Sequence, residues 1–340
     1  MIGWTASMIS YIPAFLRGLG IIYVIIPMVI QLWPGIVRHV AFLNFLCPPN
    51  AYLQLSEPHA WKLINATNIY LQCRSAVHLG VWHLAPLDGS SLCLADAEKV
   101  LIYCHGNAYH RAERHRRQLY QLLQDLGFHV ISFDYRGFGD SSGTPSEEGI
   151  IEDALDVYKW TIERVKNPHC QILVWGHSLG TTVSTQALLK LQSENFPRQP
   201  DGLILEAPFT KLLEVMYEYP LSKFLIVIYP KWLILSIIKA AVDKNRLAFN
   251  TVECLPKLKM DMLILHAKDD KRVPYQFGHK LYKTLQSGSK CHSCKLVSFD
   301  HSHGLGHNEC WSYHGFSDIV SDFSTAVKES KCHGFTTVDF

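Results

Sequence analysis

The sequence has almost no excess of charge of either sign. It contains 32 lysine and arginine residues against 30 aspartate and glutamate residues, so the net charge is +2 with histidine neutral. Proteins that bind the phosphates of nucleic acid usually carry a strongly basic surface. The near-zero net charge of this chain does not indicate nucleic-acid binding. We therefore set nucleic acid aside as a partner. Internal repeats and low-complexity tracts are also missing.

A disulfide framework is missing as well, although the chain has ten cysteines. At 340 residues the chain is far above the size that needs disulfides or metals to fold. The cysteines are scattered, and several lie in apolar runs such as LIYCHG, where a free buried cysteine is ordinary. Only Cys291 and Cys294 are close enough in sequence to suggest a redox or metal motif.

Charge is absent from one long apolar stretch, residues 18–37, which reads GLGIIYVIIPMVIQLWPGIV. A helix needs about 20 apolar residues to cross a bilayer. The prediction of a spanning helix is weakened by Pro27, Gln31 and the Pro-Gly pair at 34–35. A buried or interfacial hairpin is the alternative interpretation. We expect residues 1–37 to hold a single membrane anchor.

Asn65-Ala66-Thr67 is the only N-glycosylation sequon in the chain. Such triplets also occur by chance. A used sequon together with a crossing at 18–37 would place the bulk of the protein on the lumenal or outer side of a membrane.

Short apolar runs alternate with helix-length segments after Val100. Six runs end in polar or glycine residues: VLIYCHG, FHVISFDYRG, QILVWGHS, DGLILEAPF, MLILHAKDD and CKLVSFD. This alternation is typical of a mostly parallel sheet with helices on both faces, whose function gathers at the carboxyl ends of the strands. We predict an α/β domain over 68–330, a connector over 38–67, a tail over 331–340, and helices over 114–126, 147–165 and 181–192.

Residues 211–250 break the alternation, because they are rich in aromatic and aliphatic side chains with apolar stripes too wide for a simple surface helix. Two interpretations stay open. The segment forms either an apolar cap over the strand ends or additional core helices.

The pentapeptide GHSLG at 176–180 closes an apolar run and opens a helical segment. In a strand-turn-helix context the glycines allow a sharp turn that exposes the hydroxyl of Ser178, which predicts a nucleophile rather than a helix-capping serine. A serine needs a base to take its proton and an acid to orient that base. Asp270 or Asp269, after MLILHA, can supply the acid, and we favour Asp270.

The base is expected on the loop after the last strand, where His301, His303 and His307 are candidates. We favour His307, because glycines at 304 and 306 give it a flexible loop, with His303 as the second choice. An oxyanion also needs two backbone donors. We predict that the amides of Leu179 and Asn107 provide them.

The segment HRAERHRRQ at 110–118 places four arginines beside this predicted site. A solvated helix face is the ordinary explanation, and the alternative is that Arg111 or Arg114 holds an anionic group of the substrate. Asp134 and Arg136, in the glycine-dense segment FDYRGFGDSSGTPSE, are expected to hold loops beneath the site rather than to carry chemistry.

The ordered motifs HGNA, DYRGFGDSSGTPSE, GHSLG, LEAPF, HAKDDKRVP and GHN resemble the serine hydrolases of the α/β-hydrolase fold, and especially their membrane-anchored lysophosphatidylserine and monoacylglycerol lipase branch. The resemblance implies a lipid substrate and an acyl-enzyme intermediate on Ser178, with Asp270 as the acid and His307 as the base. It implies no metal or organic cofactor. It also implies a protein of the endoplasmic reticulum membrane with one crossing and a lumenal catalytic domain. A glycosylation site at Asn65 agrees with a lumenal position of that domain.

Three rival hypotheses remain. The same fold also serves acyl-protein thioesterases, which act on palmitoylated cysteines, and a non-catalytic binding protein of this fold is a further possibility. The cluster CHSCKLVSFDHSHGLGHNEC at 291–310 could also hold zinc. A metal on His307 would occupy the lone pair that Ser178 requires, so we expect no metal there.

Overall fold

The computed structural model describes residues 35–44, 46, 54–218, 220–329 and 334–340, together with 21, 23–25, 28, 29 and 32. Nine strands form one sheet in the order β1-β2-β4-β3-β5-β6-β7-β8-β9. Their bounds are β1 Ala66–Gln72, β2 His78–Leu84, β3 Lys99–Cys104, β4 His129–Phe133, β5 Gln171–His177, β6 Gly202–Glu206, β7 Asp261–Ala267, β8 Ser293–Phe299 and β9 Gly334–Asp339. The pairs β1–β2 and β2–β4 are antiparallel, and all the other pairs are parallel. The prediction of a mostly parallel sheet is confirmed.

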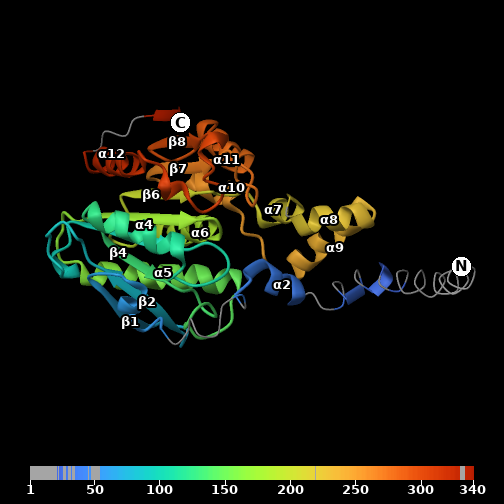
Figure 1. The fold of residues 1–340 in the computed structure, drawn as a ribbon, viewed down its shortest axis with the longest axis horizontal. Coiled ribbons are helices and arrows are strands. Elements are labelled where there is room, and N and C mark those ends of the chain that lie inside the picture. The colour runs from blue at the N-terminus through green and yellow to red at the C-terminus, as the bar shows by residue number, and fades with distance from the viewer. Residues whose placement is uncertain are drawn as a thin grey trace, which may run out of the picture.

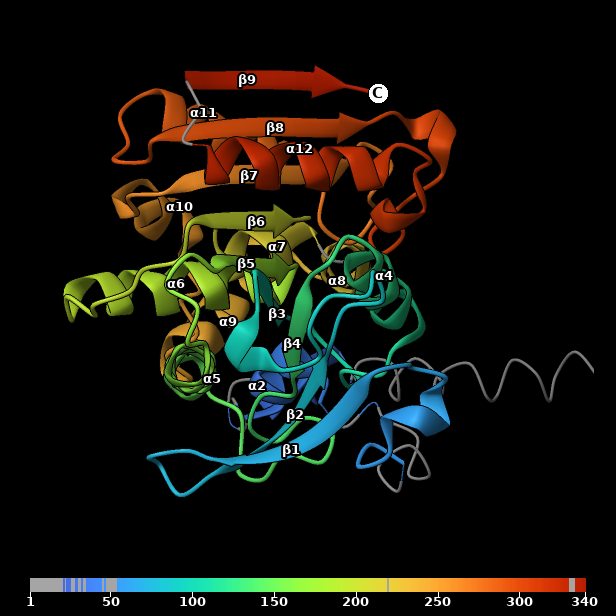
Figure 2. The same ribbon diagram turned by 90° about the vertical axis from the view of Figure 1, so that its left-hand side faces the viewer.

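Helices cover both faces of the sheet (Figures 1 and 2). The helices are α2 Gly35–Phe42, α4 Arg114–Asp125, α5 Glu147–Arg164, α6 Leu179–Ser193, α7 Leu212–Glu218, α8 Pro220–Ile228, α9 Lys231–Lys244, α10 Thr251–Cys254, α11 Gln276–Gln286 and α12 Phe316–Lys328. Side chains of α4 and α12 pack on one face, and those of α5, α6 and α11 pack on the other. The three predicted helices correspond to α4, α5 and α6, and the side chain of Ser146 caps α5 by accepting a hydrogen bond from the Gly149 amide.

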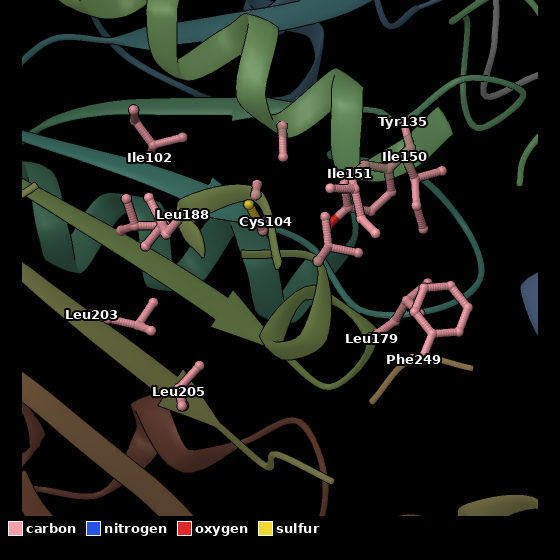
Figure 3. Close-up of a cluster of buried hydrophobic side chains, with 14 of the residues drawn as sticks. Ile102, Cys104, Tyr135, Ile150, Ile151, Leu179, Leu188, Leu203, Leu205 and Phe249 are labelled. Carbon is pink, nitrogen blue, oxygen red and sulfur yellow. The ribbon is translucent and has the colours of Figure 1, made fainter. Parts of the chain in front are cut away.

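The core on the α5–α6 face reaches up to the turn that carries Ser178 (Figure 3). Strands β3 and β6 contribute buried aliphatic side chains, and α6 contributes Leu179 and Leu188. Every residue of β5 and β6 is buried, as expected for central strands covered on both faces. Because this packing holds both ends of the turn, the turn after β5 sits on a rigid base.

Two segments predicted to be irregular have regular structure. Within 38–67, α2 continues to Phe42, a 3₁₀ turn covers Pro58–Trp61, and Leu55 is buried. Within 331–340, β9 pairs in parallel with β8, where it covers the edge of the sheet. Exposed edges favour pairing with any extended chain, and the three consecutive β-branched residues of GFTTVD suit a strand.

The segment 211–250 forms α7, α8 and α9, which project from the body of the protein (Figure 1). Ile234, Ile237 and Ile238 of α9 are buried, so part of the segment is packed, whereas part of α8 is exposed. In the described part of the chain, no helix is both long and apolar enough to span a bilayer. Half of the stretch 18–37 predicted to be an anchor lies outside the described residues.

Candidate active site

Ser178 occupies a strained turn between β5 and α6. Its backbone has φ 51° and ψ −114°, a conformation that residues other than glycine rarely adopt. A Cβ atom on Gly180 would lie 1.9 Å from the carbonyl oxygen of Cys104, and one on Gly176 would lie 2.4 Å from the oxygen of Gly180. The glycines of GHSLG are therefore required for the close approach of β5, α6 and the end of β3, which presents Ser178 at the carboxyl edge of the sheet.

Asp270 and His307 are brought together from two loops at the same edge. The Nδ1 atom of His307 donates to Oδ2 of Asp270 over 2.6 Å. The other oxygen, Oδ1, accepts the amides of Arg272 and Val273 at 2.8 and 2.9 Å. With Nδ1 protonated, Nε2 of His307 carries the lone pair that a general base uses.

The charge of Asp270 is fixed by its surroundings. Burial alone would raise the pKa of its carboxyl, but the charge of His307 and hydrogen bonds from His266 and His307 lower that pKa well below its usual range. The side chain is fully buried. Asp270 is therefore ionised throughout the physiological pH range, as an orienting acid must be.

The rejected candidates have other roles or none at this site. Both oxygens of Asp269 accept the amide of Gly306 at 3.0 Å, so Asp269 holds the loop that carries His307. His301 and His303 are exposed in a short 3₁₀ turn, where His303 lies edge-on against Tyr313. Neither of these two histidines lines the cavity at Ser178.

His177, directly before Ser178, is a further support for the loop of His307. Its Nε2 atom donates to the backbone oxygen of His307 over 3.0 Å. Burial, followed by the charge of His307, lowers the pKa of His177 to about 3, so this imidazole is neutral. The bond fixes the distance between the turn after β5 and the loop after β8.

Asn107 and Leu179, the predicted oxyanion donors, line one cavity with Ser178 and His307. The side chain of Asn107 has a second role that the sequence did not reveal, since its Nδ2 atom donates to the backbone oxygen of Ala41 in α2 over 2.7 Å. Its Oδ1 atom accepts the Ala108 amide at 2.9 Å. Helix α2 therefore helps to shape the loop after β3.

The cavity has a volume of about 340 Å³ and a mixed lining. Its apolar residues come from α2, α6, α7 and the segments that follow α2, β6 and β7: Ala41, Leu43, Leu179, Phe209, Leu212, Val215 and Val273. Its polar residues include Glu113, His115, Arg116, Arg272 and Asn308. Ser178 shares the cavity with both kinds of side chain, so one molecule with an apolar and a polar part can be accommodated beside it.

Arg111 and Arg114, predicted to hold an anionic group, do not line this cavity. Arg111 is fully buried, and its guanidinium donates to Asp134 and Asp140 at 2.5 Å. Arg114 is exposed and pairs with Glu309 at 2.7 Å. The predicted structural role of Asp134 is confirmed, and Arg136 likewise holds a loop by donating to Asp153.

Replacing Arg111 by alanine is expected to lower the free energy of unfolding by about 3–5 kcal/mol, because Asp134 would stay buried without its partner. The matched change Arg114→Ala should cost less than about 1 kcal/mol, since that pair is exposed to water. Urea denaturation of both variants measures the difference. A small loss for Arg111→Ala, equal to that for Arg114→Ala, would contradict the structural role of Arg111.

Arg272 and His115 are among the polar residues of the cavity that sequence reasoning missed. Arg272 follows Asp270 by two positions, so its nearness to the predicted acid was a usable signal. His115 lies within the basic run at 110–118, and nothing in the sequence separates it from its neighbours. Its Nε2 atom is buried without a hydrogen-bond partner among the described residues.

The cluster at 291–310 lies wholly within the described residues. No group of three or more histidine, cysteine or acidic side chains there, or elsewhere in the described chain, is placed to hold a metal ion. Cys291 and Cys294 are free rather than paired, which answers the question left open by their spacing.

Comparison with known structures places the fold. Residues 99–225 match the family described as alpha/beta hydrolase fold. The Pyrococcus furiosus esterase Pf2001 has a TM-score of 0.61 at 17% identity, covering 79% of this chain and 93% of its own. An alpha-beta hydrolase from Vibrio vulnificus has a TM-score of 0.64 at 17% identity, covering 86% and 92%. At these identities the likeness concerns the fold alone, and that fold is the α/β-hydrolase fold.

Closer relatives identify the branch. Lysophosphatidylserine lipase ABHD12 of Danio rerio is 38% identical over 324 residues, which cover 90% of this chain and 81% of the relative. The Mus musculus protein of the same name is 37% identical over 308 residues, covering 86% and 74%. Human Protein ABHD12B is 38% identical over 259 residues, covering 73% and 69%. The chain belongs to this ABHD12 family of α/β hydrolases, so the predicted resemblance is confirmed.

Proposed function

We propose that this protein hydrolyses the acyl ester of a lysophospholipid, of the lysophosphatidylserine kind, or of a monoacylglycerol, through an acyl-enzyme on Ser178. The chain is an ester hydrolase of the α/β-hydrolase fold, and the proposal adds its nucleophile, its intermediate and its substrate. The observation that carries it is the cavity at Ser178, lined by both apolar and polar side chains, together with the 2.6 Å bond between His307 and Asp270.

In the proposed reaction, Nε2 of His307 takes the proton of Ser178 as its oxygen attacks the ester carbonyl. The amides of Asn107 and Leu179 are the proposed donors to the oxyanion that forms. Collapse of this intermediate expels the alcohol half, which receives its proton from His307. Water, activated by the same imidazole, then releases the fatty acid from Ser178.

The apolar residues of the lining suit the acyl chain, and the polar residues suit the head group. Arg272 is exposed, and no acid of the described chain forms an ion pair with it. Burial, followed by the charge of Arg116, lowers the pKa of His115 far below its usual range, so His115 is a neutral imidazole with an unused Nε2 atom. We propose that these two side chains contact the phosphate of a lysophospholipid.

Replacing Arg272 by glutamine is expected to lower kcat/KM for lysophosphatidylserine by about 10- to 100-fold, since a hydrogen bond to a charged group contributes about 1.5–3 kcal/mol. A monoacylglycerol with the same acyl chain should be hydrolysed at an unchanged rate. Mass spectrometry of the released fatty acid measures both. The control is Arg114→Gln, which removes a nearby charge outside the cavity.

Equal losses for the charged and neutral substrates would show that Arg272 does not select the head group, while leaving the ester chemistry intact. Wild-type protein that cleaves neither substrate, but removes palmitate from a cysteine thioester, would support the thioesterase hypothesis instead.

We further propose that the protein resides in the endoplasmic reticulum membrane, with one crossing at 18–37 and a lumenal catalytic domain. The family resemblance and the sequon support this. Asn65 is partly exposed, and its Nδ2 atom donates to the oxygen of Pro86 over 3.0 Å, which still leaves one amide hydrogen free. Glycan at Asn65 that an endoglycosidase removes, and that is lost in Asn65→Gln, is the expected result. An unglycosylated Asn65 in protein expressed in animal cells would argue against a lumenal domain.

A further inference from the structure

The outer face of α8 and the start of α9 exposes large apolar side chains. Phe224, Val227 and Ile228 of α8 are 61%, 85% and 44% exposed, and Trp232 of α9 is 71% exposed. The first three are spaced three and four residues apart, which places them on one side of the helix. We call these four residues the cap patch. Soluble proteins rarely leave such side chains grouped on the surface unless they contact another apolar body.

The cap patch is the outer side of a helix pair whose inner side is already packed. Leu225 and Ile226 of α8 are partly buried against the core, and Ile234 and Ile238 of α9 are buried. Helix α8 is therefore apolar on nearly all sides, whereas α9 has an exposed polar face that includes Ser236, Lys239 and Asp243. A helix that is apolar all round is normally surrounded by protein or by lipid, and here the protein covers only one side.

Charges around the cap patch favour lipid over a second copy of the chain. Residues 220–244 contain four lysines and one aspartate, a net charge of +3. Lys231 lies next to Trp232 in sequence, and it has no ion-pair partner among the described acids. Lys223 pairs with Glu218 at 3.0 Å and Lys239 pairs with Asp243 at 2.7 Å. Two cap patches pressed together would bring Lys231 of one copy near Lys231 of the other. Tryptophan and phenylalanine flanked by lysine match instead the interface of a bilayer with anionic head groups.

A second apolar surface lies beside the cap patch. The ring of Tyr229, between α8 and α9, stacks on that of Tyr23 with centroids 4.5 Å apart. The described neighbours of Tyr23 in the N-terminal segment are also exposed and apolar: Ile21, Val24 and Ile25. On the other side, α7 leads directly into α8, and its Leu212 and Val215 line the cavity at Ser178. Helix α8, which carries most of the cap patch, therefore connects the helix that lines the cavity with the surface at Tyr229 and Tyr23.

We propose that the cap patch docks on a lipid bilayer and inserts Phe224, Val227 and Trp232 into its interfacial layer. This inference goes beyond the proposed function, because it requires neither the ester chemistry nor a crossing at 18–37. Docking would place the apolar residues of the cavity lining next to the lipid surface, and the lysines would lie at the level of the head groups.

The test uses the full chain reconstituted in vesicles of phosphatidylcholine and phosphatidylserine. The photo-crosslinking residue p-benzoylphenylalanine replaces Val227 or Trp232, and mass spectrometry identifies what it captures. The matched control is Leu92, which is 58% exposed but lies before β3, at the edge of the sheet away from the cavity. We expect lipid adducts when the crosslinking residue is at position 227 or 232, and no lipid adduct when it is at position 92.

A second variant separates docking from mere nearness to the membrane. In protein with the crosslinker at position 224, the double change Val227→Asp and Trp232→Asp should abolish the lipid adduct, because charges do not enter the apolar layer. The control change Leu92→Asp should leave the lipid adduct at position 224 intact. An unchanged melting temperature would show that both variants remain folded. Adducts to a second copy of the chain, no lipid adduct at 227 and 232, or an adduct that survives the double change would each overturn the proposal.

Discussion

Replacing Ser178 by alanine is expected to abolish labelling by a fluorophosphonate probe and to lower kcat for a soluble acyl ester on the order of 10⁶-fold. The probe forms a covalent bond with an activated serine oxygen, which the variant lacks. The strained turn at Ser178 tolerates alanine no worse than serine, so the variant should fold. Gel fluorescence of the labelled protein and a chromogenic ester assay measure the two effects.

The control for this experiment is Ser184→Ala in the same helix. Ser184 is buried, donates to the oxygen of Thr181 and lies outside the lining of the cavity. It should keep both labelling and activity. Folded wild-type protein that never labels, or a Ser178→Ala variant that still does, would refute Ser178 as the nucleophile.

Replacing Asp270 by asparagine is expected to lower kcat about 10⁴-fold. Asparagine keeps the shape of the side chain but removes the charge that holds Nδ1 of His307 protonated. An amide group facing Nδ1 can reverse the tautomer, which places a proton on the Nε2 atom that must accept one. Substrate binding should change little, so the loss should appear in kcat rather than KM.

The neighbouring change Asp269→Asn is a closely matched control. Asparagine can still accept the amide of Gly306 through its Oδ1 atom, so the loop of His307 should keep its position. We expect only a small loss of activity. Equal losses at 269 and 270 would mean that the loop, rather than the bond between Asp270 and His307, governs the reaction.

Much of this arrangement could be predicted because each signal is local. The buried strands are continuous apolar runs, and GHSLG lies between one of them and a helix. Asp270 and His307 each follow a strand at the same edge of the sheet, so chain order and topology together predicted their neighbourhood. The choice of Asp270 rested on the Val-Pro pair that begins three residues later, and the structure shows the amide of Val273 donating to Asp270.

The rest depends on contacts between distant segments. The residues of HRAERH alone do not indicate that Arg111 is buried against Asp134 and Asp140 while Arg114 is exposed. The hydrogen bond from Asn107 to Ala41 joins residues 66 positions apart. The segment 38–67, predicted to be a connector, therefore contributes to the site. The free edge of β8 likewise determines that the tail is a strand, because an edge can only be seen once the sheet is assembled.

The most direct test of an acyl-enzyme on Ser178 is a partitioning measurement with hydroxylamine as a second acceptor. A lysophosphatidylserine and a monoacylglycerol with the same acyl chain would pass through the same acyl-serine. The account predicts one ratio of hydroxamate to fatty acid for both substrates, with both products lost in Ser178→Ala. A ratio that depends on the leaving group, or fatty acid released without any hydroxamate, would contradict a shared intermediate.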